Sequence, residues 1–317
     1  MAEVLAVFGI TFPIFAVVAI GYGLVATRIV HPDSVPVFGF YVMNIALPAV
    51  VLSAIVSSGP GTGMNGGFVA AYSLGSLATI LLSFLWFSLS TGPVRRSVAV
   101  LGSSYPNSSF VGYPLMLIAF PDIAGAVLAM SIMVESLLIA PIAFIILADA
   151  PGQAALKGAS LARVKATAIN LLRRPIVLAL IGGFALSAAG LTLPAPVMRL
   201  TALLADSAPA MALLVIGGSI AGLPVRGNRA LAAQIVAGKL VLHPAMTFLA
   251  VMALGAFGIS LGGDMQSAVV IAAALPMLSI YASIAQEVDQ AGLAALAQLG
   301  AIVGAFFSLS ILLAVLG

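Results

Sequence analysis

Ten apolar segments follow one another along this chain, separated by short stretches that contain Gly, Pro or charged residues. They fall near residues 3–27, 35–57, 66–91, 97–120, 123–148, 175–192, 196–223, 228–256, 264–286 and 290–316. A helix that crosses a bilayer needs about 20 apolar residues, so each segment is a candidate span. Of the 317 residues, 62% are apolar and 7% are charged, against roughly 25% charged in an average soluble domain. The sequence therefore predicts an all-α polytopic membrane protein with ten transmembrane helices, and it excludes a soluble or disordered chain.

The 12 Lys and Arg residues indicate orientation, because they form no basic stripe of the kind that binds nucleic acid. Ten of them lie in the odd-numbered loops: Arg28, Arg95, Arg96, Lys157, Arg163, Lys165, Arg173, Arg174, Arg226 and Arg229. By the positive-inside rule these loops face the cytoplasm, which puts both termini outside. We expect a multi-pass protein of the cell inner (plasma) membrane, with a basic cytoplasmic loop at 149–174.

Catalytic and metal chemistry has little support in the composition. The chain has no Cys, and its two His residues, His31 and His243, lie in different regions. A zinc site or a Ser-His-Asp triad needs several such groups close together. We therefore expect no enzyme activity, no cofactor and no bound metal.

The basic loop at 149–174 separates two halves of five segments each, 1–148 and 175–317. An odd number of crossings makes the second half run through the membrane in the opposite direction. Prolines recur at matched intervals, which are 35 and 34 residues for Pro13–Pro48 and Pro175–Pro209, and 66 and 67 residues for Pro48–Pro114 and Pro209–Pro276. Together these features predict two inverted five-helix repeats.

The fourth segment, 97–120, has a proline close to its centre. Pro106 is followed directly by Asn107, Ser108 and Ser109. Proline removes a backbone donor and clashes with the carbonyl four residues earlier, and Asn and Ser are preferred N-caps for a helix that begins just afterwards. The pattern predicts two half-helices that meet inside the membrane, with the N-terminus of the second half facing a polar solute.

The ninth segment, 264–286, repeats this arrangement. Pro276 lies near its middle and is followed by Ser279 and Tyr281. We predict that broken helices 4 and 9 cross in opposite directions and form the solute site. The alternative is a pair of ordinary proline kinks, which neighbouring helices can accommodate.

Four ionisable residues lie within the segments, where a charge costs at least about 2.5–3.5 kcal/mol. They are Glu135, Asp206, Lys239 and His243, the last one helical turn after Lys239 on the same face. Read functionally, they are ion-coupling candidates: proton-carrying carboxylates, a cation that attracts an anionic substrate, and a histidine that titrates near neutral pH. The structural alternative is a Lys–carboxylate pair, or hydrogen bonds to the carbonyls of the broken helices.

Asn44 and Asp206 precede prolines at matched places in the two halves. Each of them either flanks the crossing of the broken helices or forms a hydrogen bond that holds neighbouring helices together.

Five stretches, in order along nearly the whole chain, share a pattern with a known family. They are NIALPAVVLSAI (44–55), PNSSFVGYPLM (106–116), DSAPAMALLVIGGSI (206–220), KLVLHPA (239–245) and ALPMLSIYASIAQEV (274–288). Together they resemble the auxin efflux carrier family, which includes the plant PIN carriers and bacterial malonate/malate-type permeases. The strongest of the five is the Pro-Asn-Ser stretch.

The resemblance implies ten helices in two inverted repeats, with a scaffold and a transport domain that move in an elevator fashion. It also implies an organic-anion substrate and no catalytic chemistry. By position, Pro106 and Asn107 would form the first part of the crossover, with the Asn107 amide contacting the solute, and Pro276 would mark the second. The chain departs from the family pattern after Pro276, where many relatives have an Asn or a second Pro and this chain has Ser279 and Tyr281.

We therefore predict a secondary transporter of a small organic anion, a carboxylate, that is proton-coupled or potential-driven. Sodium coupling, as in the bile-acid-type carriers, is the alternative within this class. Its oxygen ligands would come from Asn44, Ser108, Ser109, Asp206 and Ser279. A channel or a non-transporting receptor is the alternative of another class, although no ring of charge is visible. The expected partners are the anion, the bilayer and H⁺ or Na⁺; a homodimer is left open, and nucleic acid is not expected.

Overall fold

The computed structural model describes residues 2–57, 64–148, 173–223 and 227–316. Every regular element in this part of the chain is a helix. Most of the predicted loop at 149–174 lies outside the described residues, as do the cations Lys157, Arg163, Lys165 and Arg226.

Seven of the described helical segments are long and apolar enough to cross a membrane. They are α1 (Ala2–Ala26), α2–α3 (Val35–Tyr41 and Leu47–Ser57), α4 (Gly66–Ser90), α7–α8 (Ala124–Val134 and Ala140–Ala148), α11 (Ala195–Ile220), α12–α13 (Arg229–Ala237 and His243–Ala256) and α16 (Ala291–Leu316). Each overlaps one predicted segment. For the described residues, the prediction of an all-helical chain with several helices long and apolar enough to cross a membrane is confirmed.

The other three predicted segments form shorter helices. The segment at 97–120 overlaps α5 (Pro93–Ser104) and α6 (Tyr113–Ala119), and the segment at 264–286 overlaps α14 (Gly263–Ala273) and α15 (Tyr281–Gln286). The segment at 175–192 forms α10 (Pro175–Ala188), a helix of 14 residues. Both proline-centred segments are therefore interrupted.

Residues before the helices explain several starting points. The Asn65 side chain accepts a hydrogen bond of 2.9 Å from the Phe68 amide at the start of α4. The Asn228 side chain does the same for the Leu231 amide, at 3.1 Å, at the start of α12. Such caps satisfy amides that have no partner within the helix.

Four helices widen into a π-helical segment, and each such segment ends two residues before a proline. They are η2 (Val42–Ala46) before Pro48, η3 (Ser108–Gly112) before Pro114, η4 (Glu135–Ile139) before Pro141 and η5 (Gly238–Leu242) before Pro244. Proline cannot donate to the carbonyl four residues earlier and its ring crowds that carbonyl, so the helix loosens just ahead of it. The widened segments contain the candidate site residues Asn44, Ser108, Glu135 and Lys239.

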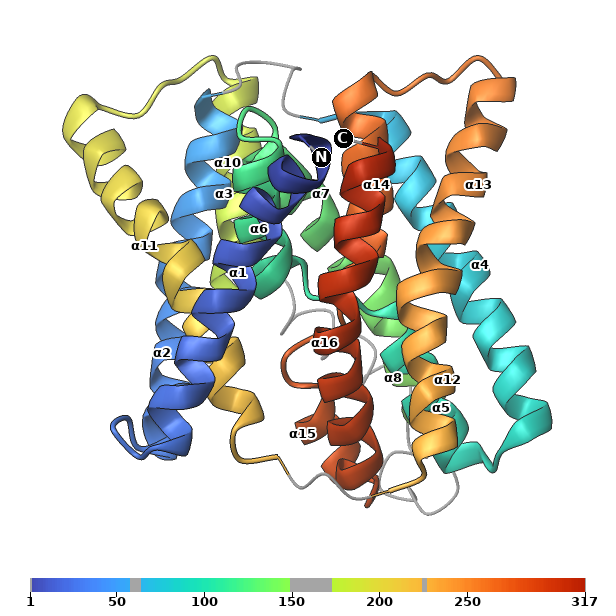
Figure 1. The fold of residues 1–317 in the computed structure, drawn as a ribbon. Coiled ribbons are helices and arrows are strands. Elements are labelled where there is room, and N and C mark those ends of the chain that lie inside the picture. Colours follow the sequence, from blue (N-terminus) through green and yellow to red (C-terminus); the bar gives the residue numbers. More distant parts are fainter. Residues whose placement is uncertain (1, 58–63, 149–172, 224–226, 317) are drawn as a thin grey trace.

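The helices pack as two groups, and each group draws on both halves of the sequence (Figure 1). In one group α1 and α2–α3 lie against α10 and α11; in the other, α4 lies against α13 and α12 against α16. Glycines allow close approach in the first group. A Cβ on Gly21 of α1 would collide with the backbone of Leu214 in α11, and a Cβ on Gly217 with the backbone of Val18. Small residues at such contacts favour helix association in a bilayer.

Candidate functional site

The two interrupted segments meet at their breaks. Pro106 and Met277 form an isolated antiparallel bridge between them. The Asn107 amide donates to the Pro276 carbonyl at 2.9 Å, and a second backbone hydrogen bond of 3.2 Å flanks the bridge on its other side. Unpaired backbone groups at membrane depth are costly, so each break supplies the partners that the other needs.

Asn107 connects the two breaks through its side chain and is 4% exposed. Its Nδ2 donates to the Ser279 hydroxyl at 2.9 Å, and its Oδ1 accepts from the Phe110 amide at 3.2 Å. Asn107 is thus the N-cap of the helical segment formed by η3 and α6. Within the described part of the chain, no group accepts a hydrogen bond from the backbone amides of Ser108 and Ser109. Two free amides at a helix N-terminus are suited to bind an anion.

Ser279 is held from its other side by α16. Its carbonyl accepts a hydrogen bond of 3.0 Å from Nε2 of Gln298, a buried side chain. Among the described residues, the Gln298 Oε1 atom has no hydrogen-bond partner. Sequence reasoning missed Gln298, although an amide in the middle of the apolar segment 290–316 was a usable signal.

Glu135 lies directly behind the start of η3. The Ser108 hydroxyl donates to Glu135 Oε1, and the Tyr72 hydroxyl donates to the same oxygen at 3.0 Å. All three side chains are buried. Of the four ionisable candidates, Glu135 is therefore the one bonded to a residue of the first break.

Lys239 and His243 bond to the second interrupted segment and to α4. Lys239 Nζ donates to the carbonyl of Ala273, the last residue of α14, at 2.6 Å, and to His243 Nδ1 at 2.8 Å. His243 Nε2 shares a hydrogen bond of 3.0 Å with the Ser76 hydroxyl. The lysine satisfies a helix-end carbonyl and complements the negative end of the α14 dipole. This contact matches the structural alternative given for Lys239.

The Glu135 and Lys239 contacts adjoin each other. The rings of Tyr72 and His243 stack with their centroids 6.1 Å apart, which joins one carboxylate and one ammonium group into a single buried cluster. Tyr72 and Ser76 lie one helical turn apart on α4, and this spacing was the available sequence signal for them.

Among the described residues, Tyr281, Asn44 and Asp206 make no side-chain hydrogen bond to either break. Tyr281 is buried and its hydroxyl donates to the Val98 carbonyl at 2.9 Å, which ties α15 to α5. Asn44 donates at 2.9 Å to the Phe40 carbonyl in its own helix. The Asp206 side chain is exposed on α11, midway along that helix.

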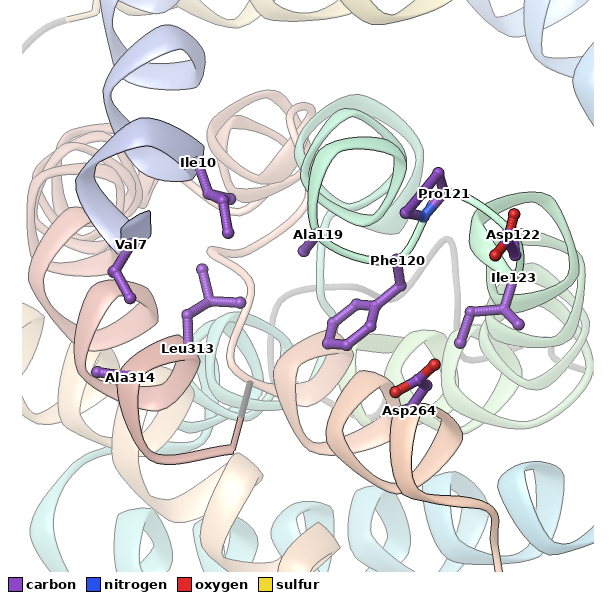
Figure 2. A pocket seen from close by; sticks show the side chains of 10 residues that line it. All are labelled: Val7, Ile10, Ala119, Phe120, Pro121, Asp122, Ile123, Asp264, Leu313 and Ala314. Carbon is purple, nitrogen blue, oxygen red and sulfur yellow. The ribbon is translucent and has the colours of Figure 1, made fainter. Parts of the chain in front are cut away.

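A cavity of about 390 Å³ opens where α6 ends and α14 begins, near the first turns of α1 and the last turns of α16. It is lined by Val7, Ile10, Ala119, Phe120, Pro121, Asp122, Ile123, Asp264, Leu313 and Ala314. Figure 2 shows Phe120 near the middle, with residues of α1 and α16 on one side and Asp122 and Ile123 on the other. Asp264 lies in the first turn of α14, where a carboxylate stabilises the helix dipole. Across the described residues, no group of three or more His, Cys, Asp or Glu side chains could hold a metal ion.

Known proteins resemble this chain over most of its length. The family described as "Membrane transport protein" matches residues 6–313. A protein of Rhizobium meliloti (strain 1021) named "Putative malonate transporter" is 27% identical over 267 residues, which cover 81% of this chain and 79% of that protein. The family match includes both breaks and the buried cluster. The chain therefore belongs to the membrane transport protein family, which is the auxin efflux carrier family that its motifs resemble.

Proposed function

We propose that this protein is a secondary transporter that carries a small carboxylate across the membrane by elevator-type alternating access, coupled to protons. Membership of a transport family supports the general activity. The name of the Rhizobium relative makes malonate the first substrate to try. The proposal assigns the protein no catalytic step.

The proposed architecture has ten spans in two inverted repeats, 1–148 and 175–317, linked by the cytoplasmic loop 149–174. Broken helix 4 is α5 with α6, and broken helix 9 is α14 with α15. The matched proline intervals support this division, as does the antiparallel bridge between the breaks. Both termini would lie outside the cytoplasm, in the inner membrane.

The observation that carries the substrate class is the capped helix start at the crossing. Asn107 caps the first turn of η3, and among the described residues no group accepts a hydrogen bond from the Ser108 or Ser109 amide. A carboxylate would gain both hydrogen bonds and the attraction of the helix dipole. The start of α15 is a weaker second candidate, because that helix has only six residues.

The two helix groups suggest which parts move. The group of α1, α2–α3, α10 and α11 would be the scaffold, and the group that holds both breaks would be the moving transport domain. Asn44 and Asp206 would then face the substrate path from the scaffold. An exposed carboxylate halfway along a membrane helix is expected only beside a polar cavity.

Glu135 is the proposed proton site. Its carboxylate bonds to Ser108, whose own amide is one of the two that would hold the substrate. A charged Glu135 would repel an anion at this short range, whereas protonation would remove that repulsion. Substrate and proton would therefore bind together, which is the thermodynamic basis of symport.

Uptake of radiolabelled malonate into proteoliposomes tests the proposal. We expect saturable uptake against a malonate gradient when the outside is acidic, with no requirement for sodium. Glu135→Gln should abolish the pH dependence, whereas Asp33→Asn, which changes a carboxylate with a 92% exposed side chain at the end of a candidate span, should keep it.

Three results would contradict the proposal. Flux that only runs downhill and does not saturate would indicate a channel. Uptake that requires sodium would show that sodium, and not the proton, is the coupling ion. Uptake in Glu135→Gln with an unchanged pH profile would remove Glu135 from the coupling step.

A further inference from the structure

An apolar groove runs between α12–η5 and α16, which lie side by side in Figure 1. Its volume is about 640 Å³, within the range of small-molecule sites in proteins. The groove is open to the surroundings, since Phe307 and Ile311 on its rim are 61% and 63% exposed. Lys239 does not line the groove, and its side chain is fully buried.

Small residues make the groove deep. A Cβ on Gly304 would lie 2.8 Å from a methyl group of Leu240, and a Cβ on Gly300 would lie 3.3 Å from a methyl group of Val236. The two helices therefore meet along the glycines, and the exposed alanines of α12 add little bulk above this contact line. A trough of this kind in the hydrocarbon region has the shape of an extended acyl chain.

Arg229 lies at one end of the groove and is the only charged residue among its described lining residues. It is the first residue of α12 and is exposed. No described carboxylate lies within ion-pair distance of its guanidinium. A cation at the start of a membrane helix is placed at the level of the lipid headgroups, where it attracts anionic lipids.

We propose that this groove is a binding site for an anionic phospholipid, with one acyl chain in the trough and the phosphate at Arg229. An apolar groove that ends in a cation with no partner among the described carboxylates complements a molecule with a long apolar chain and an anionic head. α16 itself contains no acidic residue, but the exposed residues Glu287 and Asp289 directly precede it, so a second protein copy is the alternative occupant that the experiment has to separate from a lipid. The site is independent of the proposed transport activity.

Native mass spectrometry of the purified full-length protein tests the site. The probes are phosphatidylglycerol and phosphatidylcholine with the same acyl chains, and the measurement is the fraction of protein that retains one lipid. We expect phosphatidylglycerol to be retained in preference. Arg229→Gln should reduce its apparent affinity about fivefold, because one basic residue near the surface contributes about 1 kcal/mol to anionic-lipid binding. Arg199→Gln, which removes another exposed arginine outside the groove, should leave it unchanged.

A second pair of variants tests the contribution of the apolar groove to lipid retention separately from that of the Arg229 charge. Ala237→Leu should fill the groove and reduce retention of both lipids, whereas Ala245→Leu, an exposed alanine of α13 outside the groove, should not. Size-exclusion profiles show whether each variant folds. Equal phosphatidylglycerol retention in Arg229→Gln and wild type, or an equal loss in Arg199→Gln, would overturn the site. Lipid retention unaffected by Ala237→Leu would do so too, and a shift from dimer to monomer in that variant would assign the groove to a second copy.

Discussion

Replacing Lys239 by Met tests whether the buried cluster holds the second break in place. Methionine has nearly the length of lysine and fills most of its volume, so the change removes the charge and the donors rather than the packing. Lys239 is fully buried and donates to the Ala273 carbonyl at 2.6 Å and to His243 Nδ1 at 2.8 Å. Both acceptors would lose this partner in the variant.

The contacts set the size of the effect. A hydrogen bond to a charged group contributes about 1.5–3 kcal/mol, and a cation at a helix C-terminus adds up to about 2 kcal/mol when it is partly buried. Removing the buried charge also removes its desolvation cost, which offsets part of this loss. We expect a net destabilisation of about 2–3 kcal/mol and a fall of a few degrees in Tm.

The assay is thermal unfolding in detergent, run for Lys239→Met, Glu135→Gln and the double variant. If the two charges compensate each other through Tyr72 and His243, the double variant should be at least 1 kcal/mol more stable than the sum of the single changes predicts. Arg199→Met controls for the loss of an exposed cation and should be neutral. Unchanged Tm in Lys239→Met, or strict additivity in the double variant, would refute the compensation.

Three further predictions follow from single positions. Asn107→Asp keeps the acceptor that caps the helix but loses the donor to Ser279 and adds a negative charge at the proposed anion site, so malonate uptake should fall at least tenfold; uptake near the wild-type rate would contradict the assignment. Gly75→Ala should lower Tm by several degrees, because its Cβ would lie 2.5 Å from a backbone atom of α13, whereas Gly23→Ala, with open space, should raise it slightly. Asp206→Asn changes an exposed side chain and should shift stability by less than about 0.5 kcal/mol, but it should lower the KM for malonate by removing a like charge from the path.

Much of the fold could be predicted from the sequence because the bilayer restricts the choices. Long apolar runs in lipid can only be helices, so the seven long helices follow from periodicity and length alone. Pro106 and Pro276 identified the interrupted segments, because a missing donor in the middle of a span has to be compensated somewhere. Which group compensates it could not be predicted, since the pairing of Asn107 with the Pro276 carbonyl joins residues far apart in the chain.

Most residues of the site could be predicted from the sequence, but most of their hydrogen-bond partners could not. Glu135, Lys239 and His243 were identified because charges in apolar segments are expensive. Tyr72, the partner of Glu135, and Gln298, the partner of Ser279, were missed, because a single tyrosine or amide in a span has many structural explanations. Tyr281 shows the opposite case: it follows the second break in sequence, but its hydroxyl donates to the Val98 carbonyl of α5.

The positions of the two buried charges relate to the helix dipoles at the breaks. Glu135 bonds to Ser108 at the N-terminal, positive end of η3, and Lys239 bonds to Ala273 at the C-terminal, negative end of α14. Each charge is therefore stabilised by the half-helix it contacts as well as by the other charge. Protonation of Glu135 would weaken its attraction to the start of η3 and leave Lys239 without its compensating charge. A substrate carboxylate at the Ser108 and Ser109 amides would restore a negative charge at that helix end, so anion binding and protonation should each favour the other.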